Sequence, residues 1–320
     1  MKALIEVENL RKHFGEVVAL DGISFSVDEG ELFGFLGPNG AGKTTTINIL
    51  TGIARADSGK VMVAGFDCMK DPKSHQHLIG VVPDESNLYP ELSGFDNLCF
   101  CGALYGMAGY QRKARAAELV EAFGLGEIAH RKFGTYSKGM KRRVTIAAAL
   151  MHHPGILFLD EPTSGIDVAS ARKIRQLIAD LHRGGVTIFL TTHYIEEAER
   201  LCERIAFIVE GKIVRIDSIK NLIESTGETK ALLVSVDAAT CDLIRGLQRE
   251  FSEFRFTWVG DGKIRVEYQD EISIAALVNF MESQGAEVTE ARRVLPSLED
   301  VFVKVTGLDK DLMQKDDAKQ

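Results

Sequence analysis

The stretch that decides the fold of this chain is Gly37-Pro38-Asn39-Gly40-Ala41-Gly42-Lys43-Thr44. It matches the phosphate-loop pattern G-x-x-x-x-G-K-[ST], follows the apolar run 32–36 and precedes a helical pattern over residues 45–50. Glycines let such a loop curl so that its backbone N–H groups point at phosphate oxygens, and the start of the next helix adds partial positive charge. Lys43 is then expected to reach the β and γ phosphates, and the Thr44 hydroxyl to hold Mg²⁺. The alternative interpretation is a glycine-rich turn with a surface lysine.

A pair of carboxylates further along the chain completes such a site. The apolar run 156–159 ends in Asp160-Glu161, which places both side chains at the end of a buried strand, where ligands bind in open α/β sheets. Asp160 is the candidate partner of Mg²⁺, through water, and Glu161 lies where it could polarise a water for attack on the γ phosphate. An apolar strand that ends in Asp-Glu is common, so the functional interpretation depends on the phosphate loop.

The pattern of residues 1–220 predicts an α/β domain with a mostly parallel sheet. Continuous apolar runs predict strands that are buried on both faces at residues 32–36, 156–159 and 186–190. Helical spacing between residues 169 and 182 predicts a crossover helix, and residues 1–8 alternate like a first strand. From about residue 86 to 152 no comparable strand occurs and the spacing is helical, so we expect a helical insertion there.

A second, smaller domain is predicted over residues 221–306, where the pattern changes after a polar stretch. Its elements are expected as strand 231–236, helix 239–250, strands 254–259 and 263–268, helix 272–284 and strand 286–293. This βαββαβ order is typical of a ferredoxin-like α+β fold. Because it carries no phosphate loop, metal cluster or nucleophile constellation, we interpret it as a regulatory or dimer-supporting domain, the alternative being a stabilising appendage. Residues 307–320, rich in Asp and Lys, predict a flexible tail.

Composition and charge exclude several classes of protein. The 320 residues carry 38 basic and 46 acidic side chains, a net charge of −8 without a basic block, so nucleic acid is not expected as a partner. No apolar run approaches the roughly 18 to 20 residues that span a bilayer, and the N-terminus lacks the apolar region of an export signal. The five cysteines include no C-x-x-C pair, and their odd number indicates reduced thiols. The chain is therefore expected in the cytoplasm.

Further motifs follow in order along the chain. Residues 136–140, Tyr-Ser-Lys-Gly-Met, precede a basic helical pattern, residues 162–167, Pro-Thr-Ser-Gly-Ile-Asp, follow Glu161, and Thr-Thr-His ends an apolar strand at His193. Together with the phosphate loop they resemble the nucleotide-binding subunit of ATP-binding cassette (ABC) transporters over residues 2 to about 217. The stretch 136–140 is similar to the family signature, usually Leu-Ser-Gly-Gly-Gln, and keeps its second and fourth places. The resemblance implies a P-loop NTPase cassette with a mostly parallel core sheet, an antiparallel β part and a helical insertion, and it implies ATP and Mg²⁺ as cofactors.

The resemblance also implies a role for each motif residue. Glu161, His193 and Lys43 are the expected catalytic residues, and Phe14 stands where the family places an aromatic ring against adenine. The expected ATP-binding residues are Phe14, Gly37, Pro38, Asn39, Gly40, Ala41, Gly42, Lys43, Thr44, Thr45, Ser137 and Gly139. The expected Mg²⁺ ligands are Thr44, Asp160 and Asp84. Taken singly, three of these residues could also serve the fold alone: Ser137 as a helix N-cap, Phe14 as a core residue and His193 as a strand-end histidine.

Two partners follow from the resemblance. In the family two cassettes pack head to tail, which implies a homodimer in which Ser137 and Gly139 of one chain cover the ATP of the other. The signature variant and the ending Leu-Pro-Ser-Leu-Glu-Asp-Val-Phe at 295–302 are similar to ATPase subunits of ABC-2 type exporters. A separately encoded ABC-2 type permease is then expected, with this chain peripheral at the inner face of the membrane. The alternative, a cassette that acts on ribosomes or nucleic acid, is disfavoured because only residues 45–135 separate the loop from the signature and the chain has a single cassette.

Asp84 departs from the family pattern. In Val-Val-Pro-Asp-Glu at 81–85 it stands where the family normally has a glutamine that touches the magnesium shell and the membrane partner's contact helix. A carboxylate is a good ligand for Mg²⁺, but it repels the γ phosphate unless the metal or Lys43 compensates. We therefore expect Asp84 to join the metal shell and to report site occupancy to the helical insertion. The alternative is that it caps a turn after Pro83.

Overall fold

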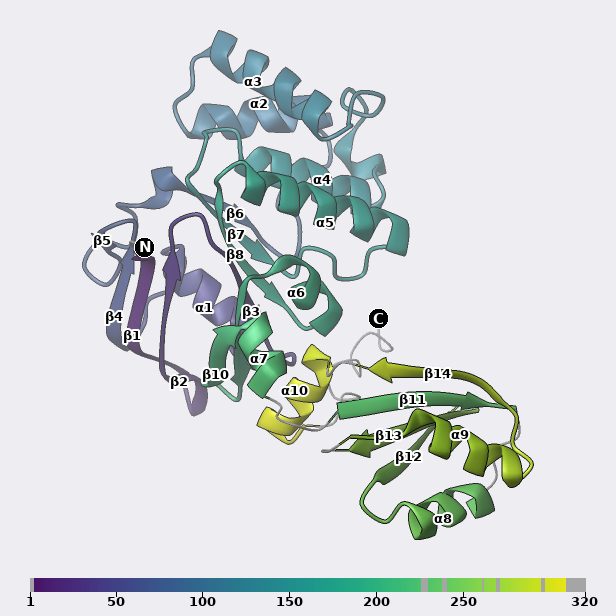
Figure 1. The fold of residues 1–320 in the computed structure, drawn as a ribbon. Helices are drawn as coiled ribbons and strands as arrows, with labels where there is room; N and C mark the ends of the chain where they lie inside the picture. Colours follow the sequence, from purple (N-terminus) through teal and green to yellow (C-terminus); the bar gives the residue numbers. More distant parts are fainter. Residues whose placement is uncertain are drawn as a thin grey trace. The chain divides into compact units, whose positions relative to one another are not determined.

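The computed structural model describes residues 3–225, 230–237, 241–260, 262–268, 271–294 and 297–308. They form two compact units, one of residues 3–219 with 305–308 and one of residues 220–304 (Figure 1). No helix among these described residues is both long and apolar enough to cross a membrane.

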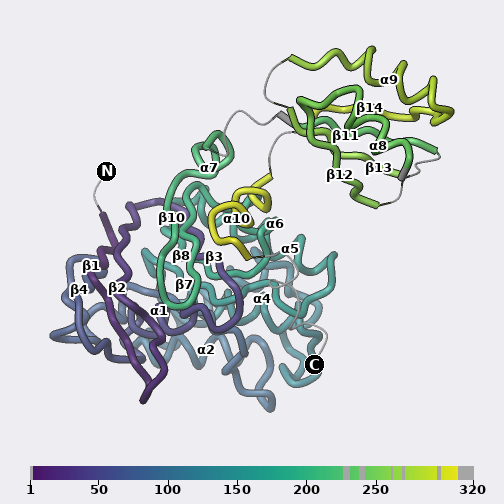
Figure 2. The backbone as a smooth tube through the Cα atoms, turned by 90° about the horizontal axis from the view of Figure 1, so that it is seen from below, coloured from purple at the N-terminus to yellow at the C-terminus, as the bar shows by residue number. Residues whose placement is uncertain are grey.

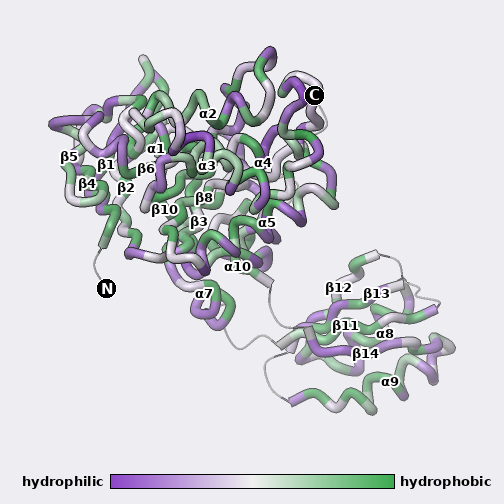
Figure 3. The backbone as a smooth tube through the Cα atoms, turned by 90° about the horizontal axis from the view of Figure 1, so that it is seen from above, coloured by the Kyte–Doolittle hydropathy of each residue, from purple (hydrophilic) through white to green (hydrophobic). Residues whose placement is uncertain are grey.

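The first unit is built on a six-stranded sheet with the strand order β10-β9-β3-β8-β7-β6. Its strands are β3 (Leu32–Leu36), β6 (Ile79–Val82), β7 (Ile156–Asp160), β8 (Thr187–Thr192), β9 (Arg204–Val209) and β10 (Lys212–Ser218). All are parallel except β10, which runs antiparallel to β9. The three predicted apolar strands are confirmed as β3, β7 and β8, which are buried along their whole length. Figure 3 shows β3 and β8 as hydrophobic segments. The predicted mostly parallel sheet is therefore present.

An antiparallel sheet forms the other wall of this unit, in the order β2-β1-β4-β5. Its strands are β1 (Ala3–Phe14), β2 (Val17–Asp28), β4 (Ser58–Val63) and β5 (Phe66–Asp67), and Figure 2 shows β1, β2 and β4 side by side. Helix α1 (Lys43–Leu50) lies between the two sheets, and its Ile47 and Leu50 share one core with Val7 of β1 and Phe158 of β7. The core thus fixes the helix that follows the phosphate loop.

The predicted helices on the core and in the insertion are also present. The helices are α2 (Gly94–Leu104), α3 (Gly109–Ala122), α4 (Lys138–Ala149), α5 (Val168–Arg183), α6 (Ile195–Leu201), and the short 3₁₀ turns η1 (Gln76–Leu78) and η2 (Phe133–Thr135). Ser93 caps α2 and Ser137 caps α4, each accepting a hydrogen bond from a backbone N–H of the first turn. The crossover helix α5 begins one residue earlier than predicted, because the Asp167 side chain accepts a hydrogen bond from the Ser170 N–H.

The second unit contains the predicted βαββαβ order in the described residues. Its elements are α7 (Ile219–Ser225), β11 (Lys230–Val236), α8 (Cys241–Glu250), β12 (Arg255–Gly260), β13 (Lys263–Tyr268), α9 (Ile274–Ser283), β14 (Val288–Val294) and α10 (Leu298–Thr306). The sheet is antiparallel, in the order β12-β13-β11-β14, and one core joins Val234, Leu247, Ile264 and Leu277. Part of the start predicted for α8, residues 239–240, and most of the predicted tail, 309–320, lie outside the described residues.

Candidate active site

The phosphate loop packs directly against backbone of neighbouring strands. A Cβ atom at Gly37 would lie 2.1 Å from the carbonyl oxygen of Ile208 in β9, and one at Gly42 would lie 2.6 Å from that of Ala19 in β2. Gly42 also has φ +105°, a backbone conformation that favours glycine. The two ends of the loop, Gly37 and Gly42, therefore have no room for side chains. Lys43, the next residue, is the first residue of α1.

Lys43, Glu161 and His193 form one buried cluster at the carboxyl ends of the parallel strands. The Lys43 Nζ atom lies 3.0 Å from Glu161 Oε1 and donates a hydrogen bond to the carbonyl oxygen of Gly37 at 2.7 Å. The other carboxylate oxygen, Oε2, lies 2.8 Å from His193 Nδ1. The exposed fraction of each residue is below one-tenth. The structure thus brings together the three residues that the sequence predicts as catalytic.

Glu161 is held in a strained and ionised state. Its φ of +47° lies in the left-handed region, and its backbone N–H donates to the carbonyl oxygen of Thr191 at 3.1 Å. Burial raises the pKa of the carboxyl, but the hydrogen bond from His193 and the charge of Lys43 outweigh it, so the pKa lies below its ordinary value. The carboxylate is therefore charged and paired with the lysine of the phosphate loop.

Asp160 is fixed beside this cluster. Its Oδ1 atom accepts a hydrogen bond of 2.5 Å from the Thr191 hydroxyl, and its side chain is buried. Thr44, by contrast, is exposed at the first turn of α1, where its hydroxyl can face a ligand. Among the described residues no three His, Cys, Asp or Glu side chains gather around a metal position. The oxygen donors of Asp160 and Thr44 fit Mg²⁺, because this ion keeps several waters and takes further ligands from substrate phosphates.

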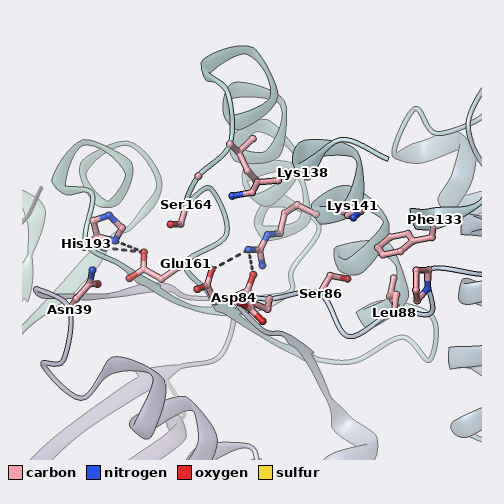
Figure 4. A pocket seen from close by; sticks show the side chains of 15 residues that line it. Asn39, Asp84, Ser86, Leu88, Phe133, Lys138, Lys141, Glu161, Ser164 and His193 are labelled. Carbon is pink, nitrogen blue, oxygen red and sulfur yellow. Dashed lines mark hydrogen bonds and ion pairs between the residues drawn. The ribbon is translucent and has the colours of Figure 1, made fainter. Parts of the chain in front are cut away.

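Asp84 lines the same pocket as Glu161 and His193 (Figure 4). It follows β6, and its Oδ1 atom lies 3.4 Å from the Arg142 guanidinium of α4. Partial burial raises the pKa of its carboxyl, and the nearby charges of Asp160 and Glu161 add to that rise against the attraction of Arg142. Asp84 thus shares a pocket with Glu161 and His193, and Arg142 ties it to the helical insertion.

The pocket is polar at one end and largely apolar at the other. It encloses about 610 Å³. Its polar end is lined by Asn39, Asp84, Lys138, Glu161 and His193, and its other end by Leu88, Phe133 and Lys141. One cavity therefore runs from the catalytic cluster to the helical insertion.

The signature residues have intrachain roles of their own. Ser137 is exposed, and its Oγ atom accepts a 3.3 Å hydrogen bond from the N–H of Met140, as expected for an N-cap. A Cβ atom at Gly139 would lie 2.5 Å from Cβ of Ser170, so close packing against α5 explains this glycine without a ligand. Exposed Lys138 follows the cap and lines the pocket. The first turn of α4 is therefore free to meet another molecule at Ser137 and Lys138.

Phe14 ends β1 with 54% of its surface exposed, so the alternative of a core residue is wrong. The Lys12 Nζ atom lies 5.1 Å from the centroid of its ring and 3.1 Å from Asp57 Oδ1. The Lys12 ammonium group therefore contacts the ring, and the exposed part of the ring offers a surface for stacking.

Sequence reasoning missed two contacts in this region. Arg142, named only as part of a basic helix, is buried and donates to the loop that carries Asp84. Glu197 of α6 is buried as well, and its Oε1 atom accepts a 2.7 Å hydrogen bond from Thr163 in the loop after Glu161. The sequence signal was the same in both cases, a charged residue placed on the apolar side of a helical pattern.

Comparisons with known proteins agree with this geometry. The family model described as ABC transporter matches residues 20–164. The linearmycin resistance ATP-binding protein of Bacillus subtilis is 37% identical over 311 residues, which cover 95% of this chain and 98% of that protein. The Nod factor export ATP-binding protein I of Paraburkholderia xenovorans is 41% identical over 313 residues, 96% of this chain and 98% of that protein. A dimeric ATP-binding cassette in a post-hydrolysis state bound to ADP and Pi matches with a TM-score of 0.61 and 29% identity, and covers 67% of this chain and 98% of that one.

Proposed function

This chain belongs to the ABC transporter family as an ATP-binding subunit, an ATPase, and we propose that it drives export through a separately encoded membrane permease. The observation that carries the proposal is the buried cluster of Lys43, Glu161 and His193 behind the phosphate loop. The names of its relatives, which concern resistance to linearmycin and export of Nod factor, favour export over import. An ABC-2 type permease is the partner that we propose from the sequence motifs.

Hydrolysis begins with an exchange of partners at Lys43. Incoming phosphates compete with the Glu161 carboxylate for the ammonium group, since Lys43 Nζ lies 3.0 Å from Glu161 Oε1. Glu161 is then released to accept a proton from the attacking water, while His193, 2.8 Å away, holds the carboxylate in position. Bound Mg²⁺, with Thr44 and Asp160 as its protein partners, would neutralise the charge that develops on the phosphates.

The second part of the proposal is a head-to-tail homodimer. Ser137 and Lys138 are exposed at the first turn of α4, where backbone N–H groups and the helix dipole favour an anion. In the dimer this turn would cover the γ phosphate bound to the other chain. Each ATP would then join the two chains, and loss of the γ phosphate would remove the bridge.

The permease would dock on the helical insertion. This region exposes three large apolar side chains, Tyr89, Phe100 and Leu104, each by at least one-third. Tyr89 lies between two residues that line the pocket, Leu88 and Pro90, and its ring is 5.1 Å from that of Phe100. Exposed apolar clusters of this kind mark protein interaction sites. The matching partner is a short cytoplasmic helix of the permease that carries apolar side chains.

We propose that residues 221–306 are a regulatory or dimer-supporting domain. They form a separate core around Val234 and Leu277, and their sequence carries no phosphate loop or nucleophile motif. A chain that ends at Asn221 should keep nucleotide binding but dimerise less well or lose regulated turnover. Unchanged dimerisation and unchanged transport would favour the stabilising appendage instead.

The function as a whole can be tested by co-expression with a candidate permease, a separately encoded protein with about six apolar segments of about 20 residues. We expect the chain to sediment with membranes only when that protein is present, and its ATP turnover to rise on association. Tyr89→Ala with Leu104→Ala should weaken sedimentation, whereas Tyr110→Ala, an exposed tyrosine at the start of α3, serves as the control. Sedimentation that is independent of the permease, or that follows ribosomes or nucleic acid, would contradict the proposal.

A further inference from the structure

Arg142 connects α4, the helix that begins within the signature residues 136–140, to the loop that follows β6. Its guanidinium, on the second turn of α4, donates hydrogen bonds to the carbonyl oxygens of Pro83 and Asp84 and lies 3.4 Å from the Asp84 carboxylate. The exposed fraction of the Arg142 side chain is only 8%. A planar guanidinium that bridges several oxygens holds them in a fixed arrangement, which a lysine could not reproduce.

A second contact joins the same two segments one helical turn further on. The hydroxyl of Thr145 lies 2.8 Å from that of Ser86, at the other end of the loop 83–86. At the far end of the helix, a Cβ atom at Gly80 of β6 would lie 2.5 Å from the carbonyl oxygen of Ala149. Helix α4 therefore packs against β6 and its loop from Arg142 to Ala149. Figure 4 shows Asp84 and Ser86 on this loop, below the helix that carries Lys138 and Lys141.

The loop leads directly to the nucleotide site of the same chain. Val82, the last residue of β6, is paired with Leu159 of β7, so the loop begins beside Asp160 and Glu161. Arg142 also interacts electrostatically with the carboxylates of both residues. A bound nucleotide and its cation change the charge around these carboxylates, and the attraction felt by Arg142 changes with it.

In the proposed dimer, the N-terminal end of α4 faces the nucleotide bound to the partner chain. Ser137 caps the helix and Lys138 begins it, and both are exposed. We propose that Arg142 is a positioning residue that couples occupancy of a chain's own nucleotide site, through the loop 83–86, to the placement of its signature turn on the partner's ATP. This inference rests on the head-to-tail dimer of the proposed function. It assigns the coupling to one side chain.

The neighbouring residue provides a matched control. The Arg143 guanidinium also donates to two backbone carbonyl oxygens, those of Phe123 at 3.1 Å and Gly124 at 3.3 Å. Those two residues follow α3, so this contact stays inside the helical insertion. Arg143→Gln removes a similar set of hydrogen bonds from the same helix without touching the loop 83–86.

The test compares ATP-driven dimerisation in chains that cannot hydrolyse ATP. Light scattering is used to find the MgATP concentration for half-maximal dimer in Glu161→Gln, alone and combined with Arg142→Gln, Arg142→Lys, Ser86→Ala or Arg143→Gln. We expect a rise of at least about 10-fold for Arg142→Gln and Arg142→Lys, the size of effect that charge-assisted hydrogen bonds produce. A smaller rise is expected for Ser86→Ala, and none for Arg143→Gln. Fluorescent nucleotide binding to the monomer should change less than about 2-fold in all of them.

Hydrogen exchange in the monomer gives an independent readout. MgATP should slow exchange in both the loop 83–86 and the first turn of α4, and Arg142→Gln should confine the slowing to the loop. Equal dimerisation of the Arg142 and Arg143 variants, or protection that still spreads to α4 in Arg142→Gln, would overturn the inference. If Glu161→Gln itself stays monomeric, the dimer proposal fails, and the exchange experiment still decides whether Arg142 links the two segments.

Discussion

Replacing Glu161 by glutamine should separate the two roles that we propose for this side chain. The carboxylate lies 3.0 Å from Lys43 Nζ, and the exposed fractions of the two side chains are 10% and 6%. At an effective dielectric constant of about 20, unit charges at that distance attract by about 5 kcal/mol. Desolvation cancels most of this, and a hydrogen bond between charged groups typically retains about 1.5 to 3 kcal/mol. ATP must overcome that residual attraction to reach Lys43.

Glu161→Gln should therefore bind ATP about 10-fold more tightly than the natural chain and hydrolyse it at least about 100-fold more slowly, because it lacks the general base. Fluorescent-nucleotide titration measures the first effect, and single-turnover release of phosphate measures the second. The control is Glu85→Gln, which changes an exposed carboxylate of the same pocket and should alter neither quantity by more than about 2-fold. Undiminished phosphate release, or affinity that falls in Glu161→Gln, would refute this reasoning.

Three further predictions concern base recognition, metal binding and alkaline stability. Phe14→Ala should weaken the binding of ATP and of GTP by similar amounts, about 1 to 3 kcal/mol, because a phenyl ring offers only stacking. A loss of affinity confined to ATP in competition binding would contradict this. Asp84→Ala should raise the Mg²⁺ concentration needed for half-maximal hydrolysis and abolish stimulation by the permease, and an unchanged magnesium titration would argue for a mere turn cap. Burial raises the pKa of the Cys68 thiol to about 12, so the free energy of unfolding should fall between about pH 9 and 12, where the unfolded thiol ionises and the folded one does not. Urea unfolding should show that decline lessened in Cys68→Ala, and an identical pH profile would count against it.

Much of the cassette could be predicted because its signals are local in sequence. The phosphate loop, the buried strands and the Asp-Glu pair after β7 each lie within a few consecutive residues. Helix α10 was missed although Leu298, Val301 and Phe302 have helical spacing. The start signal was also present, since Ser297 and Asp300 hydrogen-bond each other in a capping arrangement.

The rest of the site depends on contacts between distant parts of the chain. Nothing near Glu161 in the sequence indicates that its carboxylate rests on Lys43, or that its φ is +47°. The link from Arg142 to the loop after β6 joins residues almost sixty positions apart, so periodicity cannot reveal it. The sequence predicted which residues form the site, whereas the structure shows which of those groups contact one another.

The central claim, that ATP joins two copies of this chain across shared sites, is tested most directly by the mass of the Glu161→Gln chain in solution. Light scattering should give the 35.2 kDa of one chain without nucleotide and twice that mass with MgATP. The added substitution Ser137→Arg, which places a bulky side chain at the exposed signature turn, should return the mass to one chain. A mass of 35.2 kDa at every MgATP concentration, with nucleotide shown to be bound, would contradict the account.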